Sequence, residues 1–301
     1  MAVILTAPRL RSDSPWPRPC LWYIAGTMSN EDPKGYLHGF DETEQARLVH
    51  QARFLEHRIH DRLPFQRVRN LLEVGSGVGA QTEIILRHWP DLVLTCVERS
   101  GDNIASAEKR LGQIPWADGR WKLVNEDAQK LSFSGDQFDA AFLCWILEHV
   151  GNPAQVLSEV RRVLRVGSPV VITEVQNSSF FLDPYSPHTL TYWMAFNDYQ
   201  LEIGGDPFVG AKLGNLLLAA GYSDIRTDTN TILLDNRAPS ERAEFIAFWS
   251  DLLLSGAPGL LEAGAVSKET VEGMRGELAS IAHNPNAVFW YTFVQARATV
   301  S

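Results

Sequence analysis

The sequence has little of several features that would assign it to common classes of protein. It contains only three cysteines, Cys20, Cys96 and Cys144, and their spacing fits neither a zinc site nor a disulfide framework. Acidic residues outnumber basic ones by 36 to 27, which gives a net charge of −9. A protein that binds nucleic acid through its phosphates needs clustered Lys and Arg. We therefore predict no metal ion, no nucleic-acid partner and a cytoplasmic location.

Long apolar runs are also missing near the start of the chain. The first apolar run covers only residues 2–5, which is too short for a signal sequence or a membrane span. Residues 1–30 mix Pro, Arg and Trp without periodicity, and we predict a disordered extension there. Met28 is a candidate for the true start, and the three arginines of this extension leave organelle targeting as the alternative.

The sequence does contain a compact set of residues between positions 71 and 82, L-L-E-V-G-S-G-V-G-A-Q-T. The apolar residues before Gly75 are typical of a buried parallel strand. Gly75, Gly77 and Gly79 allow a sharp turn and a close approach to a ligand, and a helix is predicted to begin near Ala80. The strand, the glycine loop and the helix together predict a cofactor pocket.

The glycine spacing alone leaves two kinds of cofactor open. Gly75-x-Gly77-x-x-Ala80 also fits the dinucleotide fingerprint, in which a pyrophosphate lies at a helix N-terminus. Glu73 favours a different ligand, because a carboxylate at this position would attract an amino or sulfonium group and repel a pyrophosphate. A nicotinamide-dependent oxidoreductase is therefore the disfavoured alternative.

Three later predicted strands end in residues that suit the rest of a nucleoside. The second strand runs into Glu98, where α/β proteins bind a ribose diol, and Arg99 could lie against a base. The third strand leads to Asp127, a carboxylate that could accept a hydrogen bond from an exocyclic amine. The fourth ends at Cys144 and Trp145, and open α/β sheets bind ligands outside such carboxyl ends.

The chain resembles the class I S-adenosylmethionine-dependent methyltransferases, in the small-molecule branch that includes ubiquinone and menaquinone C-methyltransferases and natural-product methyltransferases. The resemblance spans roughly residues 68–174, and it rests on E-V-G-S-G-V-G-A-Q-T, Glu98, Asp127-Ala128, F-D-A-A-F-L-C-W-I-L-E-H-V and L-S-E-V-R-R-V-L-R-V-G-S. It implies an α/β, Rossmann-like doubly wound sheet of seven strands with the last strand antiparallel, helical cap insertions, and S-adenosylmethionine as the cofactor.

The resemblance also implies how the cofactor is held. Glu73 and the loop at residues 75–79 would hold the methionine moiety, Glu98 the ribose hydroxyls, and Asp127 with the Ala128 amide the adenine. The full set of predicted cofactor residues is Tyr36, Glu73, Gly75, Ser76, Gly77, Gln81, Glu98, Arg99, Asn103, Asp127, Ala128, Cys144 and Trp145.

A second resemblance concerns residues 36–52, which look like the N-terminal cap of a subset of natural-product methyltransferases. It implies that Tyr36 covers the sulfonium, where an aromatic face can supply about 2 kcal/mol. The alternative is that Tyr36 only packs an amphipathic helix against the sheet. We predict a helical cap over residues 31–64.

Two segments interrupt the alternation of strands and helices, and we predict that they are insertions in a methyltransferase domain spanning residues 65–301. The first, at about 176–206, is rich in aromatic residues that suit the wall of a small-molecule pocket. Packing of a helical cover is the alternative for about half of them. The second, at about 238–284, carries apolar residues at helical spacing, most of which we expect in the core.

Methyl transfer from a sulfonium depends mainly on positioning, and only some acceptors need a base. His149 and Glu174 are the candidate catalytic residues, with His38 and His188 as further candidates. We predict an enzyme of secondary metabolism that methylates a hydrophobic small molecule, with carbon favoured over nitrogen, oxygen or sulfur. A non-catalytic S-adenosylmethionine-binding protein is the alternative, and a homo-oligomer remains open.

Overall fold

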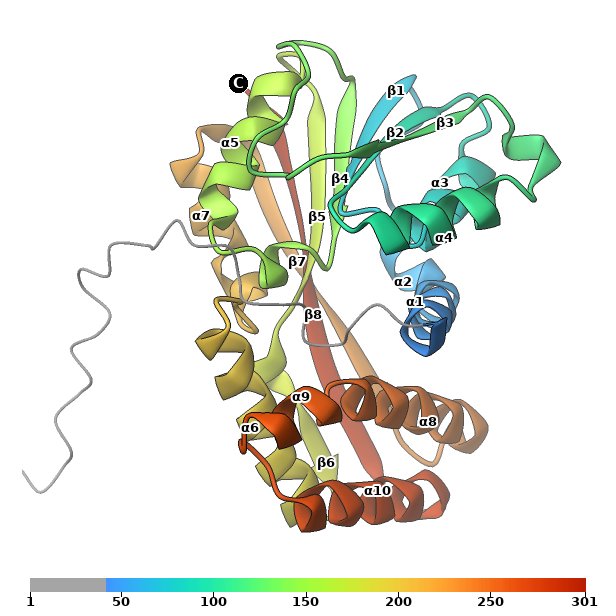
Figure 1. Ribbon diagram of the computed structural model, residues 1–301, viewed down its shortest axis with the longest axis vertical. Helices are drawn as coiled ribbons and strands as arrows, with labels where there is room; N and C mark the ends of the chain where they lie inside the picture. Colours follow the sequence, from blue (N-terminus) through green and yellow to red (C-terminus); the bar gives the residue numbers. More distant parts are fainter. Residues whose placement is uncertain (1–41) are drawn as a thin grey trace, which may run out of the picture.

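The computed structural model describes residues 42–301, which are built around one mixed sheet (Figure 1). Eight strands form this sheet in the order β3-β2-β1-β4-β5-β8-β6, and β7 pairs with β8 outside that path. Tyr36 and His38, for which roles are predicted above, lie outside the described residues.

Five parallel strands form one half of the sheet, and the glycine loop follows the first of them. They are β1 (Asn70–Val74), β2 (Val93–Glu98), β3 (Trp121–Asn125), β4 (Ala140–Cys144) and β5 (Pro169–Val175). Side chains alternate between the two faces of a strand, and both faces of these central strands are apolar. Leu71 packs in the core on one face and its neighbour Leu72 in the core on the other.

Helices cover both faces of the parallel strands. On the face of Leu71 lies α3 (Ala80–His88), and on the opposite face lie α5 (Pro153–Val163) and α7 (Leu213–Ala219). A fourth helix, α4 (Gly101–Leu111), packs near β2 and β3. This arrangement is the predicted Rossmann-like doubly wound fold.

The antiparallel part of the sheet contains one strand more than predicted. Here β7 (Tyr222–Leu234) and β8 (Val288–Val300) have 13 residues each, whereas β5 has 7. As predicted for the last strand, β8 runs antiparallel to β5. Because β8 extends past the carboxyl end of β5, its first residues pair with an additional short strand, β6 (Phe181–Asp183). The prediction of seven strands is therefore corrected to eight.

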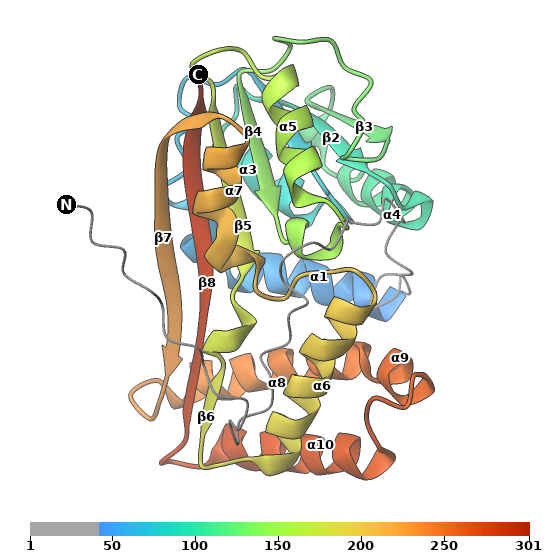
Figure 2. The same cartoon turned by 90° about the vertical axis from the view of Figure 1, so that its left-hand side faces the viewer.

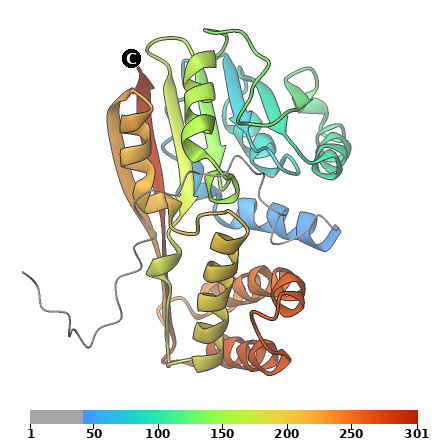
Figure 3. The same cartoon turned by 60° about the vertical axis from the view of Figure 1, so that its left-hand side comes forward.

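A helical layer lies beyond the carboxyl ends of the parallel strands (Figures 2 and 3). It consists of α6 (Pro187–Glu202), α8 (Pro239–Ser255), α9 (Ala257–Glu262) and α10 (Lys268–His283). Within the layer, α10 packs against both α6 and α8. The two segments predicted to be insertions supply all four helices.

Two further helices, α1 (Glu42–Phe54) and α2 (Glu56–His60), fall within the predicted cap. Both α3 and α8 contact α1, which lies between the sheet and the helical layer (Figure 2). Short 3₁₀ turns occur at η2 (Pro115–Ala117), η3 (Leu147–His149), η4 (Asn177–Ser179) and η5 (Val209–Lys212). From residue 42 onward, no helix combines the length and the apolar character needed to cross a membrane.

Candidate active site

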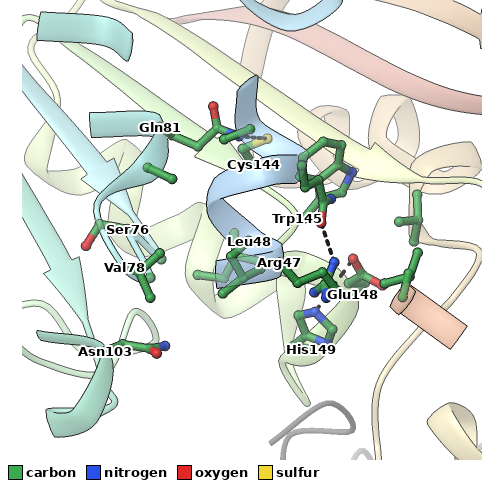
Figure 4. A pocket seen from close by; sticks show the side chains of 18 of the residues that line it. Arg47, Leu48, Ser76, Val78, Gln81, Asn103, Cys144, Trp145, Glu148 and His149 are labelled. Atoms are coloured by element: carbon green, nitrogen blue, oxygen red, sulfur yellow. Dashed lines mark hydrogen bonds and ion pairs between the residues drawn. The ribbon is translucent and has the colours of Figure 1, made fainter. Parts of the chain in front are cut away.

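A cavity of about 510 Å³ opens at the carboxyl ends of the parallel strands, within the size range of small-molecule sites. The loops after β1, β2 and β3 line one part, which we call the glycine-loop end. The other part, which we call the aromatic end, is lined by Trp193, Phe196, Phe245, Phe248, Trp249, Tyr291 and Phe293. Figure 4 shows the side chains of Glu148 and His149 next to each other, away from Ser76 and Asn103.

Two glycines of the loop after β1 have different tasks. Gly75 has a φ of 72°, and a Cβ built there would lie 2.7 Å from Cδ1 of Ile146. Only glycine therefore lets this loop pack against the loop after β4. Gly77 has a φ of 53°, but a Cβ there would meet nothing within 4 Å. The space beside Gly77 is open, so a ligand can approach the backbone closely.

Glu98 connects the glycine loop to the turn that begins α4. Its Oε2 accepts a hydrogen bond from the backbone N–H of Gly77 at 2.8 Å, and its Oε1 accepts from those of Arg99 and Ser100 at 2.9 and 2.8 Å. A carboxylate has about four acceptor sites, of which three are occupied here. The remaining site on Oε2 can accept from a ribose hydroxyl.

The loop after β3 contributes Asp127, whose Oδ1 accepts a hydrogen bond from the backbone N–H of Gln129 at 2.8 Å. This bond fixes the turn beside the cavity. The predicted cofactor residues that line the cavity are Gly75, Ser76, Gly77, Gln81, Glu98, Arg99, Asn103, Asp127, Ala128, Cys144 and Trp145. Their binding role stays a prediction, but the fold brings them to one place.

Glu73 is the one member of the predicted cofactor set, among the described residues, that does not line the cavity. It is buried, and its Oε2 accepts hydrogen bonds from the Thr82 hydroxyl at 2.6 Å and the Cys96 thiol at 3.5 Å. Burial raises the pKa of Glu73 to about 7, and the charge of Glu98 adds to this, while both hydrogen bonds oppose it. In this geometry Glu73 joins β1 to α3 and β2 beneath the cavity, and its predicted contact with the methionine moiety stays a prediction.

Two cavity-lining side chains carry buried polar atoms without a hydrogen-bond partner, the Oγ of Ser76 and the Oε1 of Gln81. The other end of the Gln81 amide, Nε2, donates to Sγ of Cys144 at 3.7 Å (Figure 4). An unpaired buried polar atom costs about 1–3 kcal/mol, so such atoms indicate where a ligand completes the bonding. Hydroxyl and amide oxygens beside a glycine loop fit the amino group of a methionine moiety.

Glu174, a predicted catalytic residue, is completely buried and does not line the cavity. Its carboxylate accepts hydrogen bonds from the backbone N–H groups of Ile146, Leu147 and Glu148 at 3.1, 2.7 and 3.3 Å. Burial and the negative charge of Glu148 raise the pKa of Glu174 well above its usual range, against the effect of these hydrogen bonds. The geometry makes Glu174 a positioning residue for the loop after β4, and its catalytic role stays a prediction.

The same loop contains a strained residue. Trp145 lines the cavity and has a φ of 54°, a left-handed conformation that costs a non-glycine residue of order 1–3 kcal/mol. Its backbone N–H donates to the carbonyl of Thr173 at 2.9 Å. This bond and the Glu174 carboxylate hold the loop in the form that presents Trp145 to the cavity.

His149, the other predicted catalytic residue, lines the cavity, and its side chain is 22% exposed. Its Nε2 lies 3.6 Å from Oε1 of Glu148, whose Oε2 accepts a hydrogen bond from Nε2 of Gln200 at 3.0 Å. The pair places an imidazole nitrogen and a carboxylate together at the wall of the cavity. Within residues 42–301, no group of three His, Cys, Asp or Glu side chains could hold a metal ion.

The aromatic end receives residues from both predicted insertions. From the first, Trp193 and Phe196 line the cavity with rings stacked at 5.6 Å, whereas Phe181 and Tyr185 are 54% and 75% exposed. His188, a further candidate base, packs against Gly273 and does not line the cavity. From the second, which was expected to be mostly core, four residues line the cavity: Phe245, Phe248, Trp249 and Leu252.

Tyr291, Asn177 and Arg47 line the cavity but are not among the predicted site residues. Tyr291 of β8 donates from its hydroxyl to Oδ1 of Asn177 at 2.8 Å. Asn177 lies two residues after the end of β5, so the rule that ligands bind at carboxyl ends of strands could have identified it. Arg47 of α1 donates from Nε to Oε2 of Glu44 at 2.7 Å; it lies within the cap resemblance at residues 36–52, which does not single it out.

Comparison with known proteins also points to the methyltransferases. Residues 72–172 match the family described as a methyltransferase domain. The chain is similar to the malonyl-[acyl-carrier protein] O-methyltransferase of Legionella pneumophila, with 25% identity over 201 residues, which are 66% of this chain and 66% of that protein. A match to the protein of the same name from Paenibacillus covers 40% of its length. The chain therefore spans less than two thirds of these curated relatives.

Solved structures share the fold. Phosphoethanolamine N-methyltransferase 2 of Haemonchus contortus, solved with S-adenosylhomocysteine, has a TM-score of 0.53 at 17% identity, over 85% of this chain and 56% of that chain. The [4+2]-cyclase SpnF has a TM-score of 0.50 at 19% identity, over 89% of this chain and 86% of that chain. At sequence identities this low, the similarity shows a shared fold and nothing about function.

Fold and site together define a Rossmann-like α/β protein with a ligand cavity at the carboxyl ends of its parallel strands. Within that class, residues 72–172 match a methyltransferase domain, and the chain is similar to class I S-adenosylmethionine-dependent methyltransferases of small molecules. The predicted family, fold class and cofactor are confirmed at this level.

Proposed function

We propose that this chain transfers the methyl group of S-adenosylmethionine to a hydrophobic small molecule of secondary metabolism, with a carbon atom as acceptor. The observation that carries the proposal is a single cavity with the glycine loop and Glu98 at one end and aromatic side chains at the other. Two molecules that react by in-line transfer must share one cavity.

The glycine-loop end would hold the cofactor, which supplies an electrophilic methyl group on its sulfonium. Ser76 and Gln81 would bind the amino-acid moiety through their unpaired oxygens, Glu98 would accept from a ribose hydroxyl, and Asp127 would accept from the adenine amine. The unpaired buried oxygens of Ser76 and Gln81 support this assignment.

The aromatic end would hold the acceptor. Its stacked rings offer flat apolar walls, and burial of apolar surface contributes about 25 cal/mol per Å². Such walls also exclude water from the transferred methyl group. A flat or extended apolar molecule fits this lining better than a charged metabolite.

His149 would accept the proton that leaves the acceptor, with Glu148 stabilising the imidazolium. A carbon acceptor gains a C–C bond and loses a C–H bond, so it needs such a base. Curated relatives include both O- and C-methyltransferases. The choice of carbon therefore rests on the resemblance to quinone C-methyltransferases and on the presence of a base at the cavity.

Calorimetric titration with S-adenosylmethionine, S-adenosylhomocysteine and NADH tests the proposal. We expect micromolar binding of the two sulfur nucleosides and none of NADH. Glu98→Gln should weaken binding at least tenfold, because a hydrogen bond to a charged acceptor is worth about 1.5–3 kcal/mol. Glu108→Gln, an exposed residue of α4, is the matched control and should change nothing.

Catalysis is tested by incubating the protein with methyl-labelled S-adenosylmethionine and a panel of lipophilic acceptors, followed by organic extraction. Label in the extract that requires Glu98 would support the proposal. Folded protein that binds neither sulfur nucleoside would contradict it.

A further inference from the structure

Trp249 of α8 has a polar hydrogen without a partner at the aromatic end. The residue lines the cavity and is 3% exposed, and its Nε1 has no hydrogen-bond partner. Five aromatic rings surround it, with centroids between 4.9 and 6.0 Å from its own: those of Phe180, Trp193, Phe245, Phe289 and Tyr291. An indole N–H can only donate a hydrogen bond. Among the described residues, no atom accepts a hydrogen bond from this N–H.

The polar groups beside Trp249 are bonded to the protein. Trp193 donates from its Nε1 to the carbonyl oxygen of Asn177 at 3.0 Å, and Tyr291 donates to Oδ1 of the same residue at 2.8 Å. Asn177 donates in turn from Nδ2 to Oδ1 of Asn197 at 2.8 Å. These bonds fix the neighbours of Trp249, and none of them involves its N–H.

The surroundings of Trp249 limit which kind of ligand group can accept a hydrogen bond from its N–H. A hydroxyl would bring an O–H that needs an acceptor of its own among aromatic rings, where the backbone oxygen of Asn177 already accepts from Trp193 and from the N–H of Phe180. A carboxylate or phosphate would meet the buried acids Glu148 and Glu174 near the same cavity, and an unpaired anion is costly among apolar rings. A carbonyl oxygen accepts without bringing either a hydrogen or a charge.

We propose that the acceptor substrate is a lipophilic carbonyl compound whose carbonyl oxygen accepts a hydrogen bond from Nε1 of Trp249. The proposal rests on the proposed function and names the substrate class of the same cavity. It makes Trp249 a residue that determines specificity, and it explains why an aromatic wall keeps a donor that nothing in the described part of the chain satisfies.

A carbonyl at this position also suits methylation of the neighbouring carbon. When His149 removes a proton from that carbon, the electron pair of the C–H bond is shared with the carbonyl oxygen, and the N–H of Trp249 stabilises the negative charge there. The carbon then forms a bond to the methyl group while the C–S bond breaks. The electron pair of that bond stays on sulfur and leaves S-adenosylhomocysteine.

Flavanone and flavan form a suitable pair of probes, because they differ only in one carbonyl against one methylene. Their dissociation constants are measured by calorimetry on protein saturated with S-adenosylhomocysteine. The wild-type protein should bind flavanone about tenfold more tightly than flavan, the usual effect of one hydrogen bond to a buried donor. In Trp249→Phe, which keeps a ring but removes the N–H, the ratio should fall to about one.

Trp193→Phe is the matched control, because its indole N–H is bonded to Asn177 and the tenfold ratio should persist. Trp290→Phe, at a side chain that is 41% exposed, replaces it if that variant does not fold. Infrared spectra of flavanone with a ¹³C-labelled carbonyl give a second readout. The carbonyl band should lie at lower frequency on the wild-type protein than on Trp249→Phe.

Equal binding of the two probes, a preference that survives Trp249→Phe, or no binding of either probe would overturn the carbonyl proposal. Each of these results can occur with S-adenosylhomocysteine bound normally, in which case the proposed methyl transfer stands. Loss of S-adenosylhomocysteine binding by the folded wild-type protein would instead contradict the proposed function itself.

Discussion

The two ends of the cavity differ in how the chain builds them. At the glycine-loop end, the lining follows directly after β1, β2 and β3, so the pairing of neighbouring strands fixes its position. At the aromatic end, the lining comes from α6, α8 and β8, which are brought together by the packing of a helical layer. The glycine-loop end thus depends on local sequence, whereas the aromatic end depends on tertiary packing.

The largest effect is expected for the loop where the two ends meet. Glu174→Ala removes the acceptor of three backbone N–H groups, and each buried donor left unpaired costs about 1–3 kcal/mol. We expect a loss of about 3–6 kcal/mol in the free energy of unfolding, measured by chemical denaturation. Methyl transfer should be lost as well, because Trp145 and His149 depend on this loop.

Glu174→Gln separates hydrogen bonding from charge. Glutamine keeps a carbonyl oxygen that accepts two of the three bonds, so it should lose about 1–2 kcal/mol. If glutamine destabilised the protein as much as alanine, the negative charge rather than hydrogen-bond acceptance would hold the loop.

The glycine-loop end could be predicted from the sequence because its residues follow strands in a fixed order. Gly75, Glu98 and Asp127 are each identified by a short apolar run before them, and all three line the cavity. Glu73 and Glu174 also lie at strand ends, but their side chains are turned into the protein. The strand pattern predicts where a residue lies along its strand. It does not predict whether the side chain points into the cavity or into the protein, because this depends on the packing on each face of the sheet.

The aromatic end could be predicted only in outline. Apolar residues at helical spacing in α8 predict a buried face, but the pattern is the same whether this face meets a core or a cavity. Phe245 and Trp249 therefore read as core, although they line the cavity. The eighth strand, β6, was missed because three residues carry too little pattern and depend on the length of β8.

A second prediction concerns the contact between the glycine loop and the loop after β4. Gly75→Ala adds a Cβ 2.7 Å from Ile146 at a φ of 72°. The left-handed conformation costs about 1–2 kcal/mol and overpacking about 1–3 kcal/mol, so the unfolding free energy should fall by about 2–5 kcal/mol. Affinity for S-adenosylhomocysteine should fall more than tenfold.

Gly119→Ala provides the matched control. Gly119 has a φ of 70°, and a Cβ there would meet nothing within 4 Å. It should therefore show the conformational cost of about 1–2 kcal/mol alone, with unchanged cofactor affinity. Equal effects of the two substitutions would mean that the contact with Ile146 is unimportant.

A third prediction concerns pH and the sheet beneath the glycine-loop end. His60 is buried with its ring 5.7 Å from that of Phe142, and burial lowers its pKa to about 4 from 6.5, although the bond to the Glu56 carbonyl opposes this. The unfolded chain binds a proton below pH 6.5, but the folded chain does so only near pH 4. Stability from this group is complete above pH 6.5 and falls by about 3 kcal/mol as the pH drops to 4.

Denaturation curves between pH 4 and pH 7.5 measure this change, with His60→Phe as the comparison. The variant should lose about 3 kcal/mol less than the wild-type protein over the same range. Parallel pH profiles of the two proteins would show that other groups cause the acid sensitivity.

The smallest effect on the cofactor is expected at the aromatic end. Phe196→Leu nearly conserves apolar volume, so stability should change by less than about 1.5 kcal/mol, and affinity for S-adenosylhomocysteine should stay within about twofold. Binding of flavanone should weaken severalfold because a stacked ring is lost. Met194→Ala, an exposed position on the same helix, should leave both affinities unchanged.

A crystal structure of the complex with S-adenosylhomocysteine tests most directly whether one cavity serves both cofactor and acceptor. The account predicts ribose hydroxyls against Glu98, adenine beside Asp127 and Ala128, the amino-acid moiety near Ser76 and Gln81, and the sulfur facing the aromatic end. A nucleoside bound elsewhere, or one whose sulfur faces away from Trp145 and the aromatic rings, would contradict it.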